Sequence, residues 1–171
     1  MRCALIFFVL LAACGQSAEP ENTVPSELAV FSSAPSGGWV FRDATLGEDL
    51  FTVHQREKEH LTDSSANRLE MQVELGAPHS GEMQASYLFT QGRLTGIRAE
   101  FTLKADEGRA LLFDSLVAHF NRHCGISSVD DGFAMWSARD SSNVNMETLV
   151  FDEHKEVGFP YLSLNIRKHG N

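Results

Sequence analysis

The chain has 171 residues, of which 14 are basic and 23 acidic, so its formal net charge is −9. This length fits one domain, or two small units that share a core. The acidic balance argues against binding to nucleic acid or to a broad anionic lipid surface, because both attract basic proteins.

Residues 1–13 have the pattern of a bacterial export signal. Arg2 supplies a positive charge, an apolar run follows from Ala4 to Ala13, and small residues precede Cys14. The run is too short to cross a membrane as a helix, which takes about 20 residues. We therefore predict a signal peptide over residues 1–13. The alternative to a lipoprotein signal is a plain export signal in which Cys14 occurs by chance.

The segment Leu11-Ala12-Ala13-Cys14 resembles the lipobox of bacterial lipoproteins. The resemblance implies that the Cys14 thiol receives a diacylglycerol, that the signal is cut before Cys14, and that the new amino group is acylated, with palmitate among the chains. Several acyl chains on one residue make a stable membrane anchor. Gly15 follows the cysteine, which by the same resemblance favours the outer membrane facing the periplasm.

One cysteine remains once the signal is removed and Cys14 is lipidated, because Cys3 leaves with the signal. Cys124 alone cannot build a disulfide framework within one chain. In an oxidising compartment a lone thiol is either reactive, paired between chains, or buried as a small apolar side chain. Its place on a predicted helix favours burial.

Residues 14–38 comprise the lipidated cysteine and a segment with three prolines and little periodicity, which predicts a flexible tether. The folded domain is expected over residues 39–171, with halves at about 39–105 and 106–171. The signal, the tether and this domain account for the whole chain.

The first half is predicted as a helix and three strands. Thr45 and Glu48 have capping-box spacing, so the helix is expected from there to about Glu59. Alternating apolar residues predict strands over 69–75, 83–89 and 94–103, with a tight turn at Gln91-Gly92 and a bulge at Gly96.

The second half repeats this order. A helix is expected over 108–124, where one face carries Phe113, Leu116, Val117, Phe120 and Cys124, and Gly125 ends it. Strands are expected over 132–138, 143–151 and 157–167, with turns at 140–143 and 152–155. Pro160 predicts an edge or a bulge in the last strand because proline lacks a backbone donor.

These elements predict an α+β fold, a tandem αβββ pseudo-repeat in which two helices pack on one face of an antiparallel sheet. Corresponding elements of the halves lie 64 or 65 residues apart. The order of elements resembles that of the β-lactamase inhibitor protein family and of outer-membrane assembly lipoproteins. The resemblance implies a function in binding other proteins but transfers no binding residues.

Candidate metal ligands are His119 and His123, which are four residues apart on the second helix. Cys124 points about 100° away from His123 around the helix, so it does not complete a site. A third ligand would have to come from elsewhere in the chain, and Asp130, Asp131 and His54 are three such candidates. We favour two polar histidines at the rim of a packed face. No metal, cofactor or catalytic residue is therefore assigned.

Four apolar side chains fall in the wrong phase for a face covered by helices: Trp136, Leu149, Phe151 and Tyr161. We predict that they form a partner-binding patch on the open face of the sheet. The alternatives are that Trp39 and Phe41 fold over them, or that the phase of one strand is wrong by one residue.

The favoured function is therefore that of an envelope lipoprotein without catalytic activity, which binds a protein partner through its sheet. Its last strand is a further candidate, as the acceptor of a strand from that partner. One alternative is a small-ligand-binding protein or an enzyme with a pocket between helices and sheet. A metal carrier that uses the two histidines is another.

Overall fold

The computed structural model describes residues 40–125, 128–130, 132–139, 145–153 and 158–168. Several expectations lie outside these residues. They are the export signal, Cys14 and the tether, Trp39, the turn at 140–143, and positions 154–155 of the last predicted turn.

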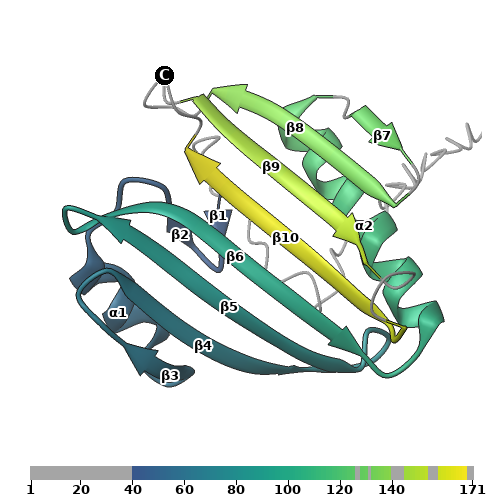
Figure 1. Cartoon of the computed structure of the whole chain (residues 1–171), viewed down its shortest axis with the longest axis horizontal. Coiled ribbons are helices and arrows are strands. Elements are labelled where there is room, and N and C mark those ends of the chain that lie inside the picture. Colours follow the sequence, from purple (N-terminus) through teal and green to yellow (C-terminus); the bar gives the residue numbers. More distant parts are fainter. Residues whose placement is uncertain (1–39, 126–127, 131, 140–144, 154–157, 169–171) are drawn as a thin grey trace, which may run out of the picture.

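Eight strands form one antiparallel sheet with the order β3-β4-β5-β6-β10-β9-β8-β7 (Figure 1). Their bounds are β3 (Leu61–Ser64), β4 (Arg68–Leu75), β5 (Gly81–Thr90), β6 (Arg93–Leu103), β7 (Ser128–Asp130), β8 (Phe133–Arg139), β9 (Asn145–Asp152) and β10 (Tyr161–Lys168). The helices are α1 (Leu50–Glu57) and α2 (Asp106–Cys124), and a small hairpin of β1 (Val40–Phe41) and β2 (Ala44–Thr45) precedes α1.

The predicted α+β class is confirmed, but each helix is followed by four strands instead of three. The additional strands are β3 and β7, at the two outer edges of the sheet. β3 has the sequence Leu-Thr-Asp-Ser and is mostly exposed, so it carries no alternation of apolar and polar residues. β7 has three residues, too few for a periodic signal.

Both helices lie on the same face of the sheet. One row of directly paired residues crosses five strands, and its members are Tyr87, Ile97, Ile166, Thr148 and Trp136. At one end of the row, the Tyr87 hydroxyl donates to Glu57 of α1 at 2.9 Å. At the other end, the Trp136 ring packs against Phe120 of α2, with 5.2 Å between ring centroids. Because residues in such a row share a face, both helices cover that face.

α1 begins later than predicted because a different residue caps it. Asp49 accepts hydrogen bonds from the Thr52 amide and hydroxyl, and these bonds lower the pKa of its carboxyl. The predicted partner Glu48 does accept from the Thr45 amide, at 3.2 Å. Glu48 and Thr45 therefore make a contact that their spacing predicted, but this contact closes the turn that precedes the helix.

α2 and the central hairpin follow the sequence more closely. Leu112, Leu116 and Phe120 of α2 are buried, with Phe113, Val117 and Cys124 partly buried beside them. Gly125 ends the helix at a φ of 84°, as predicted. Gln91 and Gly92 form the predicted two-residue turn, both at positive φ. The bulge in β6 falls at Thr95, one residue before the predicted Gly96.

The last strand is not at an edge. β10 lies in the middle of the sheet, where it pairs with β6 on one side and with β9 on the other. Pro160 precedes the strand, and its carbonyl accepts from the Leu103 amide at 2.8 Å. The prediction that this strand accepts a strand from a partner is therefore wrong, because its neighbours already use its backbone groups.

Candidate functional site

The face of the sheet opposite the helices is the candidate site, called the open face below. Two rows of outward side chains cross six neighbouring strands, in the order β4, β5, β6, β10, β9 and β8. The first row is Glu70, Ser86, Arg98, Asn165, Leu149 and Met135, and the second is Gln72, Gln84, Glu100, Ser163, Phe151 and Phe133. Each row is polar on β4–β6 and apolar on β8–β9. No helix in the described part of the chain covers this face (Figure 1).

The apolar part, called the apolar cluster, consists of Phe133, Met135, Leu149 and Phe151. Their side chains are partly exposed, and the rings of Phe133 and Phe151 lie 4.9 Å apart. Leu149 and Phe151 are therefore on the open face, as predicted. Phe133 and Met135 are also there, although the sequence pattern placed them against the helices.

Trp136 was predicted on the open face but does not lie there, because the predicted phase of β8 was wrong by one residue. Its side chain is 2% exposed and lies on the helix side. The indole nitrogen donates to the Asn121 side chain of α2 at 2.9 Å. The neighbouring Thr148 is fully buried, and its hydroxyl has no hydrogen-bond partner among the described residues. Trp136 belongs to the interior and cannot contact a partner.

Tyr161 keeps its predicted place on the open face, at the start of β10. Its row is Glu74, Glu82, Thr102 and Tyr161. Partial burial raises the pKa of Tyr161 to about 12, and the hydrogen bond between its side chain and Glu100 adds to the shift. The phenol is therefore neutral at physiological pH.

The alternative that Phe41 covers this patch is wrong. Phe41 is fully buried on the helix side, where its ring meets Tyr87 edge-on at 6.1 Å. It belongs to the same layer as α1. Trp39, the other residue of that alternative, lies outside the described residues.

The charged side chains of the open face are largely paired with one another. Three arginine–glutamate pairs lie there, Arg68 with Glu70 at 3.1 Å, Arg98 with Glu100 at 2.8 Å, and Arg167 with Glu147. The first two join residues two apart on one strand, and the third crosses from β10 to β9. These pairs leave little net charge on the middle of the face.

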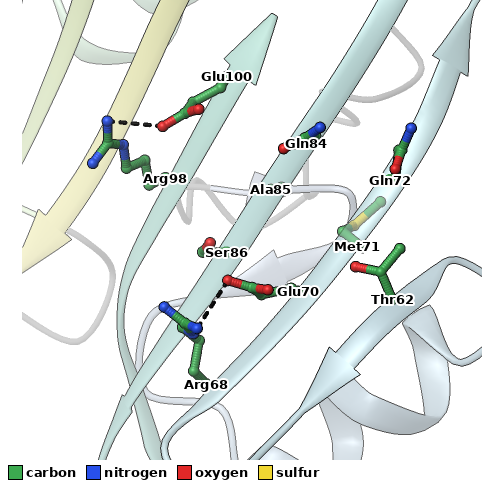
Figure 2. A pocket seen from close by; sticks show the side chains of 10 residues that line it. All are labelled: Thr62, Arg68, Glu70, Met71, Gln72, Gln84, Ala85, Ser86, Arg98 and Glu100. Carbon is green, nitrogen blue, oxygen red and sulfur yellow. Dashed lines mark ion pairs between the residues drawn. The ribbon is translucent and has the colours of Figure 1, made fainter.

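A polar hollow of about 340 Å³ lies over β4, β5 and β6 on this face (Figure 2). Its lining residues are Thr62, Arg68, Glu70, Met71, Gln72, Gln84, Ala85, Ser86, Arg98 and Glu100. The sequence pattern did not indicate this hollow. Alternation reveals which side chains point outward, whereas a concave surface depends on how the strands twist.

The candidate metal ligands His119 and His123 are only partly covered by the described residues. No group of three or more His, Cys, Asp or Glu side chains among them is arranged to hold a metal ion. The His119 ring packs edge-on against Phe120. Asp131 and the side chain of His123 lie outside the description.

The lone cysteine has the environment of an apolar side chain. Cys124 packs against the core, and partial burial raises the pKa of its thiol to about 12. The thiolate is therefore scarce at neutral pH, which agrees with the prediction of a buried, unreactive thiol.

Neither helix in the described part of the chain is long and apolar enough to cross a membrane. Comparisons with known protein families, with characterised proteins and with solved structures found no match to this chain.

Proposed function

We propose that this protein is a lipoprotein of the bacterial cell envelope that binds a protein partner through the open face of its sheet. Cys14 would carry the acyl chains, and residues 14–38 would tether the domain to the membrane, at the outer membrane facing the periplasm. The support for this part is the lipobox-like segment Leu11-Ala12-Ala13-Cys14 behind an export-type signal.

One observation carries the binding function: the sheet is covered by helices on one face and carries a partly exposed apolar cluster on the other. Apolar side chains without a covering element are a common feature of protein interfaces. The arginine–glutamate pairs add to this, because charges that are already paired lose less when a partner displaces water.

The rival function, a small-ligand site between helices and sheet, has weaker support. The polar hollow lies on the opposite face, and the inward side chains of β5, β6 and β10 are buried in the core. We retain a ligand site only as an alternative use of the hollow.

We also infer that the two halves are a structural repeat, with four strands after each helix instead of the predicted three. The support is the sheet order, in which β3–β6 and β7–β10 run outward-to-centre from opposite edges and meet at the β6–β10 pair. Duplication of one unit would give this arrangement.

The test is cross-linking in intact cells with a photoreactive amino acid at Leu149. The matched control carries it at Leu111, an aliphatic residue on α2 that is 49% exposed. We expect a discrete protein adduct at position 149 and none at 111. Adducts of equal yield at both positions, or none at position 149 in a folded chain, would refute docking on the open face.

A further inference from the structure

We propose that the partner docked on the open face is a basic polypeptide segment, which places a lysine or arginine between Glu74 and Glu82. This inference rests on the proposed function and specifies the chemistry of the partner. The other classes of occupant, an acidic segment and an uncharged one, become outcomes of the test below.

The two glutamates oppose each other directly. Glu74 of β4 pairs with Glu82 of β5 in the ladder, and both side chains are exposed on the open face. Directly opposite positions bring side chains to about 5 Å at their Cβ atoms, where like charges destabilise the sheet. A cation placed between them would relieve this repulsion.

These carboxylates differ from the others on the face. Glu70, Glu100 and Glu147 each have an arginine partner within the face. No ion pair joins Glu74 or Glu82 to a basic side chain of the described residues, and the one hydrogen bond at Glu82 comes from the neutral amide of Gln72, at 3.3 Å. Glu74 and Glu82 therefore add negative charge to this end of the face that no ion pair within the described residues offsets, which favours a positive partner.

The surface beside them suits a polypeptide backbone. The hollow begins next to this pair and is lined by the amides of Gln72 and Gln84 and the hydroxyl of Ser86 (Figure 2). Amide and hydroxyl groups can donate to and accept from peptide groups, whatever side chains the peptide carries. This lining would therefore hold a backbone while the glutamates select its charge.

The spacing points to a segment instead of a small molecule. Glu82 lies on β5 and Leu149 on β9, with β6 and β10 between them. Three strand spacings of about 4.8 Å across the sheet, and the four residues of about 3.3 Å that separate their rows along it, give a diagonal of roughly 20 Å. An occupant that reaches both places as an extended chain needs about six residues, at about 3.3 Å each. We expect one end to be basic and the other to place an apolar side chain on the apolar cluster.

The experiment keeps the photoreactive amino acid at Leu149 in the full chain and changes the charge at the other end of the face. One variant carries Glu74→Lys with Glu82→Lys, and a milder variant carries Glu74→Gln with Glu82→Gln. The control carries Glu59→Lys with Asp114→Lys, which makes the same charge change at exposed positions beside α1 and on α2. Circular dichroism confirms that each variant is folded.

We expect the lysine variant to lower the adduct yield about tenfold and the glutamine variant about fivefold, as for the loss of one or two exposed ion pairs. The control should stay within about twofold of the unsubstituted chain. Mass spectrometry of the adduct should show a lysine or arginine within about six residues of the cross-linked site.

An unchanged yield in the lysine variant would overturn this inference and leave partner docking intact. A higher yield would also overturn it, because it would identify an acidic partner. Absence of any adduct in the unsubstituted chain would reject the docking function itself, and this inference with it.

Discussion

At the scale of single residues, an ion pair with a buried carboxylate joins the β1–β2 turn to α1. Arg42 donates to Glu57 at 3.0 Å, and Glu57 is 1% exposed. Arg42 and the following Asp43 both have positive φ, in the two-residue turn between β1 and β2. Such turns favour glycine or asparagine, so the contact with Glu57 helps to hold a backbone conformation that these residues seldom adopt.

We predict that Arg42→Ala destabilises the protein by about 3 kcal/mol, because it leaves the Glu57 carboxylate buried without its cation. The double variant Arg42→Met with Glu57→Gln should recover most of this loss, since it removes both charges and keeps an acceptor for the Tyr87 hydroxyl. Urea unfolding of the two variants measures the difference. If the double variant is as unstable as the single one, the loss comes from the turn and not from the unpaired carboxylate.

Cys124 gives a second prediction at this scale, one that depends on pH. Its pKa in the folded chain is about 12, against about 8.5 for a free cysteine. At pH 8 we expect iodoacetamide to modify it about a thousandfold more slowly in the folded chain than in urea, in a variant with Cys3→Ser and Cys14→Ser. Comparable rates in both states would show that the thiol is accessible and ionised.

The same shift sets the sign of the effect of pH on stability. The folded state holds the thiol proton more tightly than the unfolded state does. Its contribution to stability is therefore complete below about pH 8.5 and is lost as the pH rises towards 12.

At the scale of elements, the two faces of β8 and β9 differ in what they contribute to stability. Trp136 is buried against α2, whereas Leu149 is partly exposed on the open face. We predict that Trp136→Ala destabilises by about 3–5 kcal/mol, because it opens a cavity beneath α2. Leu149→Ala should cost about 1 kcal/mol or less.

Chemical unfolding of both variants checks this assignment of faces. A loss of about 1 kcal/mol or less for Trp136→Ala would restore the outward phase that the sequence pattern predicted for β8, and a larger loss for Leu149→Ala would place Leu149 in the core. Equal losses would mean that both faces are covered.

The sequence predicted the elements better than their faces. In β4, apolar and polar residues alternate strictly, so periodicity alone identified both the strand and its outward side. In β8, Phe133, Met135 and Trp136 are all large and apolar, so alternation could not decide which of them faces the core. The structure decides it through contacts with α2, which are distant in sequence.

The sheet order and the hollow also depended on long-range pairing. Short links between strands predicted antiparallel neighbours, and this holds for β4–β6 and β8–β10. Nothing in the sequence indicated that β6 and β10 meet in the middle, because that pairing joins segments about 65 residues apart. The open-face arginine–glutamate pair between Arg167 and Glu147 similarly appears only once two strands are in register.

At the scale of the whole molecule, the protein is a sheet with two unlike faces. One face is covered by α1, α2 and the β1–β2 hairpin (Figure 1). The other carries the apolar cluster, paired charges and a hollow, and Figure 2 shows the hollow with two of the charge pairs. A face of this composition fits a docking function and leaves the helix side to provide stability.

Cysteine footprinting measures the occupancy of that face in the envelope. A single cysteine is placed at Leu149 or at Leu111, in a chain with Cys124→Ala, and maleimide labelling is compared between isolated envelopes and the purified protein. We predict that Leu149→Cys is labelled at least tenfold more slowly in envelopes, at the protection expected of a site with a Kd well below the partner concentration. Leu111→Cys should react equally in both. Equal labelling of Leu149→Cys in envelopes and in the purified protein would contradict docking on the open face.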